Sequence, residues 1–307
     1  MQVVDAASSL RRALDEVRTG GEAVGLVPTM GALHAGHRSL IERAAGECAH
    51  VVVSVFVNPL QFDRADDLAR YPRDLSADLA LCAAMGVGTV FAPSVAEMYP
   101  EPPRTVVSVA ALGARWEGVS RPGHFDGVAT VVAKLFCLVG PSMAYFGEKD
   151  FQQLAIVRRM ARDLSMPVSV VGCPTVREDD GLALSSRNAL LTRSERRAAT
   201  VLSRALEAGC AAGRGEDRPE AVARAMAAVV AAEPLARLDY AAAVDARDLS
   251  VPSALSAVPE VRLLVAAEVG QVRLIDNCAL TAHGGATLAG SRRGRHNRTA
   301  GEPAPSA

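Results

Sequence analysis

The chain has 307 residues, of which half are hydrophobic and 22% are charged, and its net charge is −1. This length allows about two domains, and the near-zero charge excludes a general attraction to nucleic acid or to an anionic membrane. No apolar run reaches the ~18 residues of a membrane helix, and no positively charged leader precedes the first apolar stretch, which predicts a cytoplasmic protein.

The first half of the chain alternates strand-like and helix-like segments. Apolar residues at helical spacing predict helices, and short β-branched runs predict buried strands. In chain order these are a helix over 5–18, a strand over 23–27, a helix over 36–47, a strand over 50–57, a helix over 74–85, a strand over 89–91, a helix over 127–138, a strand over 143–146, a helix over 152–164 and a strand over 167–171. This alternation predicts an α/β fold with a doubly wound parallel sheet.

The second half changes character. Ala-rich helices are predicted over 192–210 and 219–232, followed by β-like runs over 238–244, 261–269 and 271–275. The last two runs are separated only by Gly270, which resembles a hairpin. We therefore expect a first domain over 1–175, a smaller α+β domain over 176–280 and a disordered tail over 281–307, because the tail has few apolar residues.

Cysteine and lysine usage narrow the chemistry. No two of the six cysteines are close in sequence, which excludes C-x-x-C and zinc-knuckle patterns and predicts reduced thiols. Only Lys134 and Lys149 are lysines among 33 basic residues. Lys134 lies within an apolar helical run, where chance retention is the simpler interpretation. Lys149 follows a strand, where an ammonium suits a phosphate and an Arg is no equivalent substitute.

The first candidate site is the segment 28–37 (PTMGALHAGH), which follows a predicted strand and opens a helix. Gly36 allows close approach of a phosphate, and a helix start offers free N–H groups. His34 and His37 lie on the same side of the first helical turn, where they can donate hydrogen bonds to phosphate oxygens. A metal-binding His pair is the alternative, although no third ligand is evident.

Two further segments follow predicted strands, and a third lies near the start of the second domain. Asn58 and Gln61 offer amides for a carboxylate or hydroxyl, or Asn58-Pro59 simply makes a turn. Lys149 lies at the carboxyl edge of the sheet, with a surface salt bridge to Glu148 as the alternative. The segment 182–188 (LALSSRN) is a plausible phosphate clamp, or a turn that caps the following helix.

Together these four segments resemble the pantothenate synthetase family. The segments 71–74 (YPRD), 121–125 (RPGHF), 174–178 (PTVRE) and 262–277 (RLLVAAEVGQVRLIDN) also agree with it, so the likeness covers about residues 1–280. Two positions depart from the common family pattern. Ala35 stands where Glu is frequent, and Asp63-Arg64 stand where Gly-Pro is usual. Neither departure removes a residue that the chemistry needs.

The resemblance implies a Rossmann-like domain of the H-x-G-H nucleotidylyltransferase-like superfamily, followed by a lid domain. It implies a homodimeric ligase that condenses (R)-pantoate with β-alanine, using ATP and Mg²⁺. The reaction would pass through a pantoyl-adenylate and release AMP and pyrophosphate. The sequence leaves the metal ligands open.

The resemblance also assigns roles to individual residues. The catalytic residues would be His37 as the proton donor, with His34 and Lys149. Pantoate and β-alanine would be held by Gln61 and Gln153, with Asn58 and Arg121 nearby. ATP would contact Met30, Gly31, Ala32, Leu33, His34, Ala35, Gly36, His37, Gly147, Glu148, Lys149, Asp150, Val176, Leu184, Ser185, Ser186 and Arg187.

Two other functions remain open from the sequence. A nucleotidyltransferase of the same fold could act on another small acid or a phosphorylated acceptor, but a phosphate-bearing acceptor would favour basic residues over Gln61 and Gln153. A non-catalytic protein could bind nucleic acid through the Arg-rich tail, which the near-zero net charge disfavours. Because the pantoate carboxylate is ionised at neutral pH, the ligase interpretation requires no Ser or Cys nucleophile.

Overall fold

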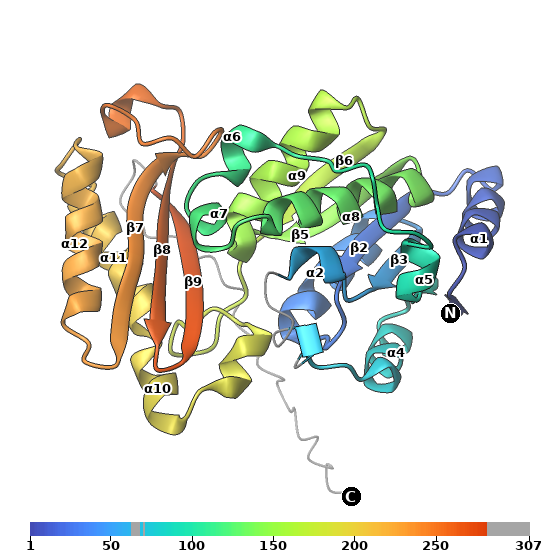
Figure 1. The fold of residues 1–307 in the computed structure, drawn as a ribbon, viewed down its shortest axis with the longest axis horizontal. Coiled ribbons are helices and arrows are strands. Elements are labelled where there is room, and N and C mark those ends of the chain that lie inside the picture. Colours follow the sequence, from blue (N-terminus) through green and yellow to red (C-terminus); the bar gives the residue numbers. More distant parts are fainter. Residues whose placement is uncertain (63–67, 70, 281–307) are drawn as a thin grey trace, which may run out of the picture.

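A computed structural model describes residues 1–62, 68–69 and 71–280 of the chain (Figure 1). The predicted tail over 281–307 and the Asp63-Arg64 departure lie outside these residues. Within the described part of the chain, no helix is both long and apolar enough to cross a membrane.

A six-stranded parallel sheet forms the larger unit. Its strands are β1 (Gln2–Val4), β2 (Val24–Thr29), β3 (His50–Val55), β4 (Thr89–Phe91), β5 (Ser142–Gly147) and β6 (Val168–Cys173). The spatial order is β1-β4-β3-β2-β5-β6, and each neighbouring pair runs parallel. The doubly wound parallel sheet is therefore confirmed, with β1 as a strand that the sequence pattern missed.

Helices cover both faces of this sheet. One face packs against α1 (Ala7–Thr19), α8 (His124–Val139) and α9 (Phe151–Asp163), and the other against α2 (Ala35–Glu47) and α4 (Leu75–Ala84). Short helices α5 (Val95–Met98), α6 (Ala110–Gly113) and α7 (Glu117–Ser120) lie between β4 and α8. The central strand β3 is buried along most of its length, which explains its continuous apolar run.

A three-stranded antiparallel sheet forms the smaller unit. It contains β7 (Ala236–Asp245), β8 (Val261–Val269) and β9 (Val272–Leu280), with helices α10 (Arg193–Ala198), α11 (Val201–Ala212) and α12 (Pro219–Ala231). The expected smaller α+β unit is confirmed. The helix predicted over 192–210 is two helices, α10 and α11, separated by a turn in which the Thr200 hydroxyl donates to the Arg197 carbonyl (2.8 Å). The β8–β9 turn has Gly270 at φ +59°.

The two units share part of one core. Ala242, Val244 and Leu264 of the small sheet pack into the cluster formed by α1, α8 and α9. The alternate residues Ala243, Leu263, Val265 and Ala267 instead pack against α11 and α12. The small sheet is therefore covered on both faces, with the larger unit as one of the covers (Figure 1).

Candidate functional site

The expected site segments converge where the strand order reverses. Strand β2 pairs with β3 on one side and with β5 on the other. From β2 the chain continues to β3 on one side, and from β5 it continues to β6 on the other side. Ligands of doubly wound folds bind at the carboxyl ends of the strands beside such a point. Residues 30–37 follow β2, and the short 3₁₀ helix η2 (Glu148–Asp150) follows β5.

The turn after β2 is held by a buried carboxylate from α4. Asp78, which is 3% exposed, accepts the backbone N–H groups of Ala32 (3.0 Å) and Leu33 (2.7 Å). Gly31 (φ +80°) and Ala32 (φ +52°) both have left-handed backbone conformations. A Cβ at position 31 would lie 2.8 Å from Asp78 Oδ2, so only glycine fits this turn.

The two histidines form a reciprocal cap at the start of α2. Gly36 N–H donates to His34 Nδ1 (3.1 Å), and His34 N–H donates to His37 Nδ1 (3.3 Å). Because both Nδ1 atoms accept, each neutral imidazole carries its proton on Nε2. The ring centroids are 4.2 Å apart. The cap therefore leaves two Nε2–H donors on neighbouring rings.

Burial keeps these rings neutral. Burial and then the neighbouring His34 lower the pKa of His37 to about 3. Burial and then the Lys149 charge lower the pKa of His34, so the ammonium lies close to the histidines. At neutral pH both rings act as uncharged hydrogen-bond donors.

Lys149 and its neighbours bring opposite charges to the same edge. Lys149 Nζ lies 3.3 Å from Asp150 Oδ1, and the Asp150 side chain is 50% exposed. Burial opposes ionisation of Asp150, but the charges of Lys149 and Arg187 outweigh it and lower its pKa. Glu148 pairs instead with Arg262 of β8 (3.0 Å), so the alternative salt bridge between Lys149 and Glu148 is wrong.

The segment 176–188 forms a loop beside Lys149. Leu184 N–H donates to the Val176 carbonyl (2.9 Å), which closes the loop. Ser185 Oγ accepts the Arg187 N–H (3.3 Å) and caps the 3₁₀ helix η3 (Ser186–Leu190). The alternative expected a cap on the following Ala-rich helix, but that helix, α10, is capped by Thr192 and not by Ser185. Lys149 and Ser185 also line one narrow pocket together with Asp276 of β9.

Gln61 contacts the start of the histidine segment. Its Nε2 contacts Met30 Sδ (3.0 Å), and its Oε1 accepts Asn58 Nδ2 (3.1 Å). Asn58 is fully buried and also donates to the Gly127 carbonyl, while Tyr99 donates to Asn58 Oδ1. Asn58 additionally caps η1 (Pro59–Gln61), so the expected turn exists and Asn58 holds Gln61.

His124 supports the same glutamine from α8. Its Nδ1 lies 2.8 Å from the Gln61 carbonyl and its Nε2 lies 3.0 Å from Arg121 Nη1. Burial and then the Arg121 charge lower the pKa of His124 to about 4, so the neutral ring donates from Nδ1 and accepts from Arg121. The backbone of Gln61 is thereby fixed.

The adjacent glutamines of α9 differ in environment. Gln152 is 5% exposed and bonds to the Leu112 carbonyl, the Arg115 carbonyl and the Glu117 N–H. Gln153 is half-buried, and no contact among the described residues engages its amide. Gln153 is therefore the one of the pair with an amide left for a ligand.

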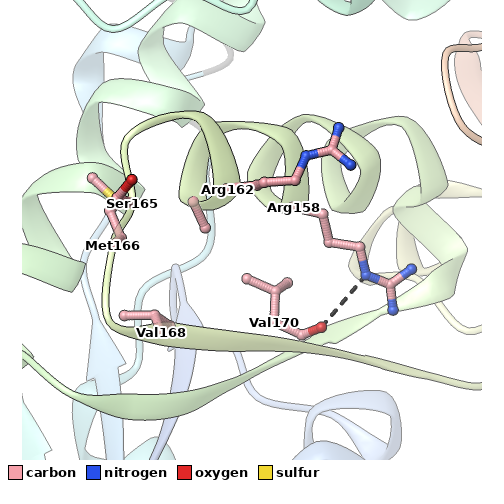
Figure 2. Close-up of a pocket in the computed structure, with 7 residues that line it drawn as sticks. Arg158, Arg162, Ser165, Met166, Val168 and Val170 are labelled. Carbon is pink, nitrogen blue, oxygen red and sulfur yellow. Dashed lines mark hydrogen bonds between the residues drawn. The ribbon is translucent and has the colours of Figure 1, made fainter.

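A hollow of about 390 Å³ lies between α9 and the edge strand β6, with Arg158, Arg162, Met166 and Val170 among its lining residues (Figure 2). None of the expected site residues lines it. Among residues 1–62, 68–69 and 71–280, no group of three or more His, Cys, Asp or Glu side chains is arranged to hold a metal ion.

Comparison with known proteins decides the family. The sequence model of the pantoate–β-alanine ligases matches residues 2–279. The chain belongs to the pantoate–β-alanine ligase family. A pantothenate synthetase of Rubrobacter xylanophilus is 55% identical over 271 residues, covering 86% of this chain and 93% of that protein. One of Rhizobium meliloti is 51% identical, covering 90% and 95%.

Solved structures agree with this membership of the pantoate–β-alanine ligases. The crystal structure of a Thermus thermophilus pantothenate synthetase superposes with a TM-score of 0.85 at 52% identity, covering 91% of this chain and 99% of that one. A Francisella tularensis pantoate–β-alanine ligase, crystallised with β,γ-ATP and β-alanine, gives a TM-score of 0.74 at 32% identity, covering 91% and 98%. The resemblance found in the sequence and the predicted fold are both confirmed.

Residues that support the ligase site were harder to find from the sequence than those that face it. From the sequence, no site role is assigned to Asp78, Gln152 or His124. Asp78 had a usable signal, because it shares the buried face of α4 with Cys82, four residues later. A carboxylate on the buried face of a helix requires a partner.

Proposed function

We propose that this ligase condenses (R)-pantoate with β-alanine through a pantoyl-adenylate, using ATP and releasing AMP and pyrophosphate. The observation that carries the proposal is the pair of neutral Nε2–H imidazoles beside Lys149 at the point where the strand order reverses. Such donors stabilise phosphate oxygens that gain charge, without a covalent enzyme intermediate.

On the phosphate side, His34, His37 and Lys149 act directly. The pantoate carboxylate attacks the α-phosphorus, and the Nε2–H groups together with the ammonium stabilise the departing pyrophosphate. Arg187, whose charge already acts on Asp150, closes the site from the other unit. The remaining nucleotide contacts are Met30, Gly31, Ala32, Leu33, Ala35, Gly36, Gly147, Glu148, Asp150, Val176, Leu184, Ser185 and Ser186.

On the acceptor side, the two amides of Gln61 and Gln153 hold pantoate. Both amides are uncharged, which suits a hydroxy acid better than a phosphorylated acceptor. Asn58 acts behind Gln61, because its own polar atoms are engaged by protein groups. The family membership likewise favours the ligase over the nucleotidyltransferase alternative.

Magnesium fits the residues present. Mg²⁺ is bound by one or two carboxylates plus substrate phosphates, so a cage of several acidic groups is not needed. The half-exposed carboxylate of Asp150 lies beside Lys149 and would hold the ion. When bound, Mg²⁺ supplies charge that neutralises the phosphates of ATP.

We expect a homodimer that works in the cytoplasm, where ATP is available. Sedimentation of the purified chain at micromolar concentration tests the dimer: a single species at the monomer mass contradicts it.

The function is tested by product release. AMP and pyrophosphate are measured from MgATP with pantoate and β-alanine together and with each omitted in turn. The proposal expects both products to require pantoate, and AMP release to require β-alanine as well. Products that form without pantoate contradict the substrate assignment. A stable nucleotide product without free AMP would point to the nucleotidyltransferase.

A further inference from the structure

A buried amide of the small sheet contacts η2, which carries Lys149. Asn277 of β9 is 4% exposed, and its Nδ2 donates to the carbonyl oxygens of Glu148 (2.9 Å) and Lys149 (2.8 Å). These two carbonyls belong to the peptide groups on either side of the Lys149 Cα. Holding both peptide planes fixes the backbone dihedrals of Lys149, and therefore the direction in which its side chain leaves the chain.

The orientation of this amide is determined by its surroundings. Asn277 Oδ1 accepts Arg262 Nε (2.8 Å), a group that can only donate, so Nδ2 must face the two carbonyls. Arg262 also bonds to Glu148 Oε2 (3.0 Å) and lies over the Phe151 ring at 4.1 Å. Arg262 thus contacts Glu148 and Phe151, which lie on either side of Lys149 in the chain.

Strand β9, which carries Asn277, also contacts the loop 176–188, the second segment proposed to bind the phosphates. Asp276, 3% exposed, accepts two hydrogen bonds from Arg177 (2.6 and 2.9 Å). Arg177 begins the loop that leads to Ser185. Asp276 Oδ1 also accepts the Asn277 N–H (2.8 Å), so the two neighbouring side chains are ordered together. Strand β9 therefore contacts both segments that face the phosphates.

We propose that Asn277 is a positioning residue for the adenylation step, which sets the Lys149 ammonium against the phosphates of ATP from the second structural unit. The inference rests on the proposed phosphate role of Lys149. It gives the small unit a positioning role in addition to the proposed ATP contacts of Ser185, Ser186 and Arg187. A misplacement of about 1 Å in such a group costs on the order of 10²-fold in rate.

The test is a double-mutant cycle read by single-turnover adenylation. Asn277→Ala removes the amide, and Asn277→Asp keeps its size and the acceptor for Arg262 while removing both donors. Tyr240→Phe is the matched control, because it removes one hydrogen bond between the units, to Glu117 (2.9 Å), and does not contact η2. Each variant is made alone, and the Asn277 variants also in a Lys149→Ala background.

We expect each Asn277 variant to lose about 10-fold or more in adenylation rate, with Tyr240→Phe within about 2-fold of the parent. In the Lys149→Ala background the Asn277 changes should cost less than about 2-fold, because the group that they position is gone. If Asn277→Ala does not fold, Asn277→Asp carries the same comparison.

Two results overturn the inference while leaving the proposed function intact. One is an Asn277 variant that adenylates like the parent while Lys149→Ala is impaired. The other is an equal loss in both backgrounds, which would mean a general structural effect. A Lys149→Ala enzyme with parental adenylation would instead show that the phosphate role itself is wrong, and the positioning role falls with it.

Discussion

Replacing Asp78 with Asn tests whether one buried carboxylate shapes the turn that carries the histidines. The wild-type carboxylate accepts two backbone N–H groups, from Ala32 and Leu33. Asn has the same size but only one acceptor oxygen, so its NH₂ group must face one of these N–H donors. The change therefore removes one hydrogen bond and leaves a buried donor unpaired.

The size of the effect follows from those two contacts. A hydrogen bond to a charged group contributes roughly 1.5–3 kcal/mol, and an unpaired buried donor costs about 1–3 kcal/mol. We expect Asp78→Asn to lower the free energy of unfolding by about 3 kcal/mol, and the melting temperature by roughly 5–10 °C. Because His34 follows this turn directly, adenylation should fall by on the order of 10²-fold.

Thermal unfolding and single-turnover pyrophosphate release from MgATP and pantoate measure the two effects. Asp74→Asn is the matched control on the same helix: Asp74 is an exposed N-cap, and Asn caps as well as Asp. It should leave both quantities within experimental error of the parent. An Asp78→Asn enzyme that melts and adenylates like the parent would refute the reasoning. Lost stability with normal adenylation would show that the turn held by Asp78 does not position His34 for the reaction.

Three further results are expected. His37 has a pKa lowered to about 3 in the folded protein, whereas in the unfolded chain it titrates near 6.5, so the unfolded state binds more protons below that value. Stability should therefore fall on acidification from pH 7 to 5 by about 2 kcal/mol through His37, and His37→Gln should show a smaller drop in melting temperature over that interval; equal drops contradict this. His37→Ala should lose about 10²-fold or more in adenylation, and near-parental single turnovers would remove the residue from the mechanism. Gln153→Ala should raise the KM for pantoate with little change in melting temperature. Gln152→Ala removes three hydrogen bonds and should instead lower the melting temperature by several degrees. The opposite pattern would mean that the two roles are exchanged.

Much of the fold could be predicted because most strands and helices have a local pattern of apolar residues. The β-branched run of β3 and the apolar spacing of α1 and α9 identify buried strands and amphipathic helices without knowledge of their neighbours. The short strand β1 escaped prediction, since three residues carry almost no periodicity. The break between α10 and α11 also escaped, because the Ala-rich helical pattern continues through it.

The sequence by itself determined the alternation of strands and helices, the segments at the strand ends and the family to which they belong. Only the tertiary structure decided which groups support them. It placed Asp78 under the histidine turn, His124 behind Gln61 and Asn277 against the backbone of Lys149. These partners are 45, 63 and 128 residues apart in the chain. Local periodicity reports which face of an element is buried, but a hydrogen bond over such a separation depends on how the elements pack.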